Sequence, residues 1–200
     1  MALATYDDLK TAVANWSHRS DLLPVMDDLI LAAETHIFQN VRIRSMETSL
    51  SATIVGMTAA VPSDYLGMRH AFLTMGGLKR AVEVCTPDYI NKTFPLSATG
   101  TPAYVAIDRG SFIFGPAPAD GNVLQGTYFA KPTALATAVN AIFTECPTLY
   151  LFATLAELEP YTENDARVPL WIAKRDELIR GVNGNSERAR YSGPMTMKVA

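Results

Sequence analysis

Apolar residues near the N-terminus recur every three or four positions, which is the spacing of one face of an α-helix. The pattern predicts two helices with a break between them. Thr5 and Asp8 have the spacing of a capping box and predict the start of the first helix. Ser20 or Asp21, ahead of Pro24, predicts the start of the second helix.

The second helix has a continuous apolar stripe that we expect to face the core. This stripe consists of Met26, Leu29, Ile30, Ala33, Ile37 and Val41. The opposite face carries Asp27, Glu34 and Gln39, and we expect that face to be in contact with solvent.

The hydrophobic period changes from helical to alternating near Arg44, which predicts a run of strands. Six strands are predicted, at residues 46–54, 66–75, 82–84, 104–107, 111–114 and 123–130. Gly76 and Gly77 predict a two-residue hairpin turn, because glycine adopts positive φ without a steric penalty. Short strands at this spacing predict a small antiparallel β sandwich or barrel.

Helical patterning returns in the C-terminal third. Pro147 begins a segment that is apolar on almost every side, which predicts a helix in the middle of a bundle. Asn164 is a candidate cap for the last helix, and Pro169 predicts a kink or a later start. Residues 181–184 (GVNG) are typical of a helix end, although a helix continuing to Arg190 would be about 40 Å long. Two apolar seams are expected on it: Trp171, Leu178 and Val182, and then Ile172 and Ile179.

The sequence therefore predicts an α+β fold. We expect N- and C-terminal helices, residues 1–44 and 133–191, to form a helical bundle into which a β module, residues 45–132, is inserted. Residues 192–200 have no helical period and are expected to form an extended C-terminal tail.

Composition excludes several classes of protein. The 200 residues contain 48% hydrophobic and 18% charged residues, which is typical of a folded chain and not of a disordered one. The net charge of −3 argues against a protein that binds nucleic acid phosphates over its whole surface. No apolar run has membrane-spanning length and no signal peptide is evident, so we expect a soluble intracellular protein with no membrane partner.

Residues capable of catalysis or metal binding are few and scattered. The three histidines, His18, His36 and His70, have no paired spacing that would face one metal. Cys85 and Cys146 are too far apart in sequence for a CxxC pair. No phosphate-binding or nucleophile motif follows a predicted strand. We therefore expect no metal, no cofactor and no enzymatic activity. An acidic patch is expected to be a solvated helix corner; it consists of Glu157, Glu159, Glu163 and Asp165.

The C-terminal segment differs from the rest of the chain. From residue 180 onward four basic residues accompany one acidic residue, Glu187. Apolar side chains alternate within this segment, which has no core of its own, so it is either a frayed terminus or a docking segment. The candidate docking residues are Arg188, Arg190, Tyr191, Met195, Met197 and Val199.

Several motifs along the chain resemble those of the head-to-tail adaptor (connector, or tail tubular) proteins of tailed bacteriophages. They are residues 62–66 (PSDYL), 100–104 (GTPAY), 115–118 (GPAP), 128–132 (YFAKP), 147–153 (PTLYLFA), 159–161 (EPY) and 188–193 (RARYSG). The resemblance extends over nearly the whole chain; Pro169 departs from the unbroken helix expected there.

This resemblance implies a structural virion protein in the neck between capsid and tail, assembled in the host cytoplasm. Members form a homo-oligomeric ring, usually of twelve copies, that docks on the portal through C-terminal segments. The ring continues the channel for double-stranded DNA, without sequence-specific binding, and attaches the downstream tail or nozzle protein.

Two other functions are compatible with the residues. The β module could bind a glycan or peptide; the candidate stacking residues are Tyr104, Phe112, Tyr128 and Trp16. An enzyme could use Cys85 or Cys146 as a nucleophile with His70, although nothing in the spacing supports this.

Overall fold

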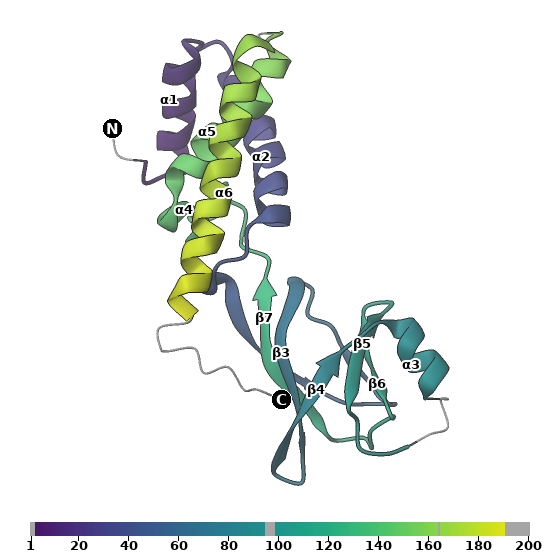
Figure 1. Cartoon of the computed structure of the whole chain (residues 1–200). Coiled ribbons are helices and arrows are strands. Elements are labelled where there is room, and N and C mark those ends of the chain that lie inside the picture. Colours follow the sequence, from purple (N-terminus) through teal and green to yellow (C-terminus); the bar gives the residue numbers. More distant parts are fainter. Residues whose placement is uncertain (1–2, 95–98, 164, 191–200) are drawn as a thin grey trace. The chain divides into compact units, whose positions relative to one another are not determined.

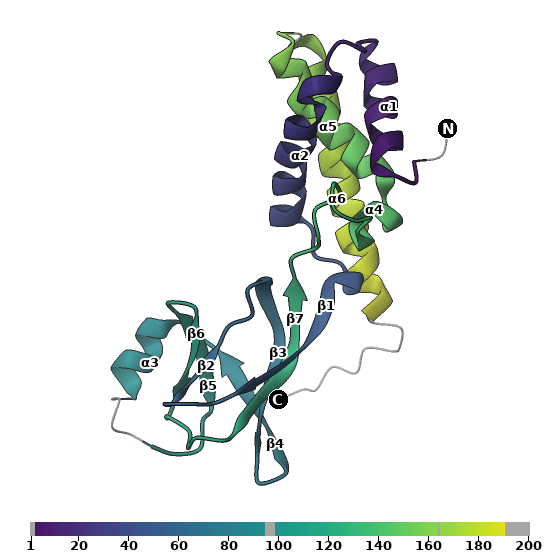
Figure 2. The same ribbon diagram turned by 180° about the vertical axis from the view of Figure 1, so that it is seen from behind.

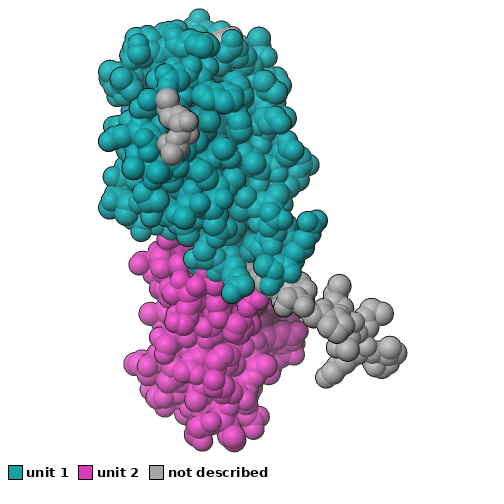
Figure 3. Space-filling model, turned by 90° about the vertical axis from the view of Figure 1, so that its left-hand side faces the viewer, with its two compact units in different colours: residues 1–46, 132–200 teal, residues 47–131 magenta. Residues whose placement is uncertain are grey.

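The computed structural model describes residues 3–94, 99–163 and 165–190, without the side chains of residues 165 and 190. The chain divides into two compact units, residues 1–46 with 132–200, and residues 47–131 (Figure 3). The first unit is helical and the second is built on a sheet, which confirms the predicted α+β class.

The central element of the helical unit is α5. Its helices are α1 (Tyr6–Ser17), α2 (Met26–Asn40), α4 (Ala141–Glu145), α5 (Pro147–Tyr161) and α6 (Val168–Arg190). Short 3-10 turns are η1 (Leu23–Val25), η2 (Arg44–Met46) and η3 (Asp165–Arg167). Helix α5 packs against α1, α2, α4 and α6, and α6 crosses one face of it (Figure 1). This central position explains why α5 is apolar on nearly every side.

The N-terminal helix begins and ends as its sequence indicates. Thr5 and Asp8 form the predicted capping box, and His18 ends α1 with a left-handed backbone. The predicted start of α2 is wrong. Pro24 lies in η1, and α2 then begins at Met26 without a side-chain cap from Ser20 or Asp21.

The last helix, α6, continues beyond Gly181 and Gly184, where the sequence predicts its end. Pro169 lies in the first turn of α6, where its missing N–H is not needed, so the helix starts late and is not interrupted. Asn164, the expected cap, lies outside the described residues. The prediction of a stop at residues 181–184 is wrong, since α6 continues to Arg190. Trp171 and Ile179 are buried, but Ile172 is exposed and forms no seam.

Two glutamates predicted to face solvent are buried. Glu34 is 3% exposed and its Oε1 accepts hydrogen bonds from the Leu135 N–H at 2.7 Å and from the Tyr150 hydroxyl at 3.4 Å. Glu159 is 2% exposed and accepts a hydrogen bond from Trp171 Nε1 at 3.3 Å. The prediction that both side chains face solvent is wrong, because a carboxylate can be buried where hydrogen-bond donors contact it.

The second unit contains one seven-stranded sheet, in the order β1-β7-β3-β4-β5-β6-β2. The strands are β1 (Glu47–Thr53), β2 (Thr58–Ala60), β3 (Tyr65–Met75), β4 (Leu78–Val84), β5 (Tyr104–Asp108), β6 (Ser111–Gly115) and β7 (Val123–Ala130). The terminal strands β1 and β2 come into contact, so the sheet is nearly closed, like a barrel (Figure 2). A short helix, α3 (Pro87–Thr93), is capped by Thr86 and packs against β5 and β6.

Two details of the β module differ from the prediction. The sheet is not wholly antiparallel, because β4 pairs with β5 in parallel, through Glu83 with Tyr104 and Val84 with Val105. The sheet also has a seventh strand, β2, whose three residues are too short to show an alternating pattern. The predicted hairpin is confirmed: Gly76 and Gly77 join β3 to β4 with φ values of 53° and 82°.

Candidate docking site at the end of the last helix

Side chains from the C-terminal half of α6 bind the segment that follows α2. Asn183 Oδ1 accepts a hydrogen bond from the Arg42 N–H at 2.8 Å, and Asn183 Nδ2 donates to the Asn40 carbonyl at 2.9 Å. One turn later, Ser186 Oγ accepts from the Arg44 N–H at 2.8 Å. The spacing of three residues puts both side chains on one face of the helix, so α6 supplies the acceptors for the N–H groups of Arg42 and Arg44.

A groove lies beside this contact, within the helical unit. Its volume is about 470 Å³ and it is lined by Arg44, Ser45, Glu145, Val182, Asn185, Ser186 and Ala189. Helices α4 and α6 and the turn η2 therefore each supply part of the wall. Ser45 Oγ donates to Glu145 Oε1 at 2.5 Å, which connects η2 to α4 within the lining of the groove. Val182 and Ala189 are the apolar residues of the lining, and the remaining lining residues are polar or charged.

The candidate docking residues lie at or beyond the end of this helix. Arg188 is exposed on α6. Arg190 is the last residue of the helix, and its side chain is outside the described part of the chain. Tyr191, Met195, Met197 and Val199 also lie outside the described residues. The groove begins one residue before Arg190, at Ala189, so it is adjacent to the start of the predicted tail.

The groove residues were not identified from the sequence. Asn183 and Ser186 are polar residues on a helix, a pattern that also fits a solvated face. Their role depends on backbone N–H groups 141 and 142 residues earlier in the chain, and no local signal indicates that pairing.

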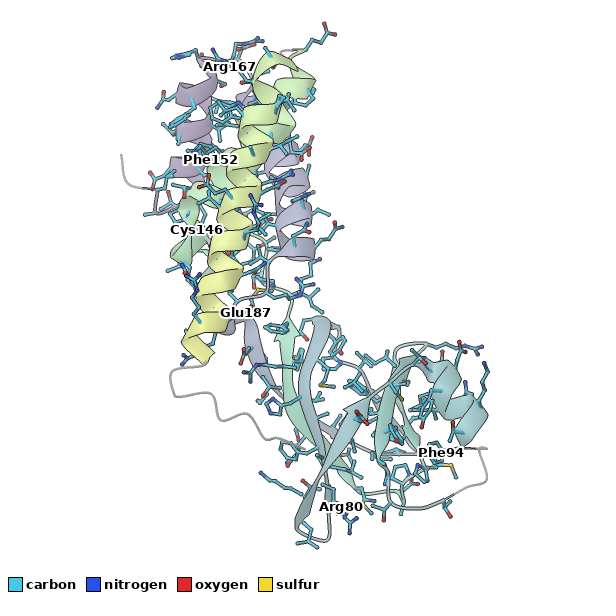
Figure 4. All side chains as sticks on the ribbon, viewed as in Figure 1. Arg80, Phe94, Cys146, Phe152, Arg167 and Glu187 are labelled. Atoms are coloured by element: carbon cyan, nitrogen blue, oxygen red, sulfur yellow. The ribbon has the colours of Figure 1, made fainter. Side chains whose placement is uncertain are left out.

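The residues considered for chemistry have separate environments. His70 stacks on Phe72, and its Nε2 is 3.4 Å from Thr127 Oγ1. Cys85 and Cys146 are free thiols, and the N–H of Cys85 donates to the Val105 carbonyl (Figure 4 marks Cys146). Burial, and then the charge of Glu83, raises the pKa of Cys85, whereas a nucleophilic cysteine needs a lowered pKa.

The three histidines form no metal site with one another. Among the described residues, no group of three or more His, Cys, Asp or Glu side chains could hold a metal ion. His18 ends α1, and His36 lies on α2 beside α6. Burial and the nearby Arg175 guanidinium lower the pKa of His36, so its imidazole is neutral at pH 7.

The four aromatic residues considered for ligand stacking do not form one platform. Phe112 and Tyr128 belong to the buried core of the sheet, together with Leu73 and Leu124. Tyr104 packs against other rings at the α3 side of β5. Trp16 belongs to the helical unit, where it contacts Phe152 and Trp171 edge-on with centroid distances of 5.6 and 5.8 Å.

Comparisons with known proteins identify one family. The family model described as SU10 adaptor protein matches residues 4–198, which is nearly the entire chain. No curated protein matches the sequence. Within the described residues, every helix is too short or too polar to cross a membrane. The chain belongs to the SU10 adaptor protein family, in agreement with its resemblance to phage head-to-tail adaptors.

Proposed function

We propose that this protein is a structural component of the virion neck, a ring-forming head-to-tail adaptor rather than an enzyme. The observation that carries the proposal is the family match over residues 4–198. In this proposal the ring, with twelve copies, docks on the portal, continues the DNA channel and attaches the downstream tail or nozzle protein. Assembly takes place in the host cytoplasm and needs no membrane or cofactor.

The two-unit organisation supports such a role. A helical unit whose chain is interrupted by a separate β unit offers two independent surfaces, which suits a protein that contacts different neighbours. The net charge of −3 is compatible with a channel through which double-stranded DNA passes without being held by its phosphates.

We assign portal docking to the C-terminal segment. Arg188 is exposed at the end of α6, and the following residues combine positive charge with alternating apolar side chains. The proposed contacts are made by Arg188, Arg190, Tyr191, Met195, Met197 and Val199. Such a segment can add a strand to a partner's sheet edge or occupy a groove on it.

The direct test mixes the purified protein with the portal of its own phage. Native mass spectrometry and negative-stain imaging should show many copies capping one end of the portal ring. A chain ending at residue 190 should remain folded and fail to dock, and a variant with Glu187→Gln serves as the full-length control. Failure of two folded proteins to associate would contradict the adaptor role, and normal docking by the shortened chain would remove the segment from the mechanism.

A further inference from the structure

The groove at the end of α6 is lined by Ala189, six residues before the apolar residues of the C-terminal segment begin at Met195. We propose that, in the free protein, residues 195–199 of the same chain occupy the groove between α6, α4 and η2. The adaptor role does not require this contact. The contact would bury the apolar docking residues until a partner protein displaces them from the groove.

The first argument is proximity within the helical unit. Ala189, which lines the groove, is one residue from the last described helical residue, Arg190. Gly193 and Pro194 follow shortly afterwards, and this residue pair is typical of a chain reversal. A reversal there would direct residues 195–199 back along α6.

The second argument is spacing. Groove residues Val182, Asn185 and Ala189 recur along α6 every three or four residues, so they span about 10 Å at 1.5 Å per residue. The alternate residues Met195, Met197 and Val199 would span about 13 Å in an extended chain. Three side chains can thus meet three successive positions on the helix, with Met197 near Asn185.

The third argument is chemical complementarity. The apolar side chains of Val182 and Ala189 in the lining suit methionine, whose flexible side chain fills irregular spaces. In an extended segment Lys198 would lie on the opposite side from Met197 and Val199, so its charge could stay in water. The volume of about 470 Å³ is large enough for two or three side chains.

Disulfide trapping in the isolated full-length protein tests this contact. In a Cys85→Ser, Cys146→Ser background, Asn185→Cys is combined with Met197→Cys. The matched control combines Glu187→Cys with Met197→Cys. Glu187, labelled in Figure 4, is also exposed and closer to the chain end, but it is not among the residues that line the groove. Two residues of helix turn it about 200° away from Asn185.

We expect the groove pair to form an intramolecular disulfide about tenfold faster than the control pair, because docking raises the effective concentration of the two thiols. Equal rates would overturn the proposal, as would disulfide-linked dimers as the main product, because the segment would then engage another copy. Hydrogen exchange provides a second measurement without cysteine substitution. Amides of residues 44–45 and 182–189 should exchange several-fold faster in a chain ending at residue 190, and unchanged exchange would also overturn it. These measurements involve no portal, so a negative result leaves the adaptor role intact.

Discussion

The Asn183 side chain accepts a hydrogen bond from the backbone of Arg42, 141 residues earlier in the chain, at 2.8 Å. The contact joins the segment after α2 to the C-terminal half of α6. Asn183 also donates to the Asn40 carbonyl, so a single side chain satisfies two backbone groups that have no strand or helix partner. This residue therefore holds the segment after α2 against α6.

Replacing Asn183 by alanine should destabilise the helical unit by about 1 kcal/mol. The loss of one partly buried and one exposed hydrogen bond costs about 1–2 kcal/mol. The better helix propensity of alanine offsets about 0.5 kcal/mol of this loss. Asn185→Ala is the matched control, since Asn185 is exposed on the same helix turn, and it should be neutral or slightly stabilising. The measurement is denaturant unfolding followed by tryptophan fluorescence, because Trp16 and Trp171 are the only tryptophans and both lie in the helical unit. Equal effects of the two variants would contradict the role of Asn183.

Glu34 is expected to be the most sensitive polar position of the helical unit. Glu34→Ala leaves the Leu135 N–H without its acceptor and removes a partner of Tyr150, which should cost about 2–4 kcal/mol. Glu34→Gln keeps one acceptor oxygen and the shape, so its cost should be smaller. Gln39→Ala, at an exposed position of the same helix, should change the free energy of unfolding by less than about 0.5 kcal/mol. The same fluorescence measurement applies, and an alanine variant as stable as the wild type would contradict a stabilising role of these hydrogen bonds.

Two glycines in the sheet should respond oppositely to alanine. A Cβ at Gly126 of β7 would overlap the backbone carbonyl oxygen of His70 and lie 3.1 Å from the Ala71 Cα, so the strands β3 and β7 would have to separate. We expect Gly126→Ala to lower stability by about 2–3 kcal/mol. A Cβ at Gly67 of β3 meets nothing within 4 Å, and Gly67→Ala should be neutral or stabilising by up to about 1 kcal/mol. Thermal unfolding followed by circular dichroism compares the two variants. A Gly126→Ala variant as stable as the wild type would show that β3 and β7 can separate at this point without loss of stability.

The ion pair between α1 and α2 should contribute to acid sensitivity. Lys10 Nζ lies 2.5 Å from Asp27 Oδ1, and the Tyr6 hydroxyl donates to the same oxygen at 2.7 Å. The hydrogen bond from Lys10, and then that from Tyr6, lowers the pKa of Asp27 below its ordinary value of 3.8. Because the folded pKa is lowered, the stabilisation is present above the ordinary pKa and is lost as pH falls below about 4 and through the folded pKa.

The free energy of unfolding of Asp27→Asn should therefore fall less than that of the wild type as the pH is lowered from about 5 to below about 4. Since Asp27 is largely exposed, the difference should stay below about 1 kcal/mol and shrink at high salt. Asp28→Asn, at the next position of the same helix turn, is the control and should follow the wild-type pH profile. Parallel pH profiles for Asp27→Asn and the wild type would show that the pair does not contribute to stability.

Elements that depend on neighbouring residues were predictable from the sequence. The capping box at Thr5 and Asp8, the turn at Gly76 and Gly77 and the strand β7 all follow from interactions within a few residues. The short strand β2 and the parallel pairing of β4 with β5 could not be predicted, because each depends on a partner distant in the sequence. The positions of Glu34 and Glu159 were mispredicted for the same reason.

The family and the α+β class could be inferred from the sequence itself, because periodicity and short motifs are local properties of the chain. The sequence also contains the alternating apolar residues of the C-terminal segment. Only the tertiary structure places a groove beside the end of α6, because its walls come from residues 44–45, Glu145 and residues 182–189. These segments come together only when the helices pack around α5. No sequence pattern within any one segment predicts that contact.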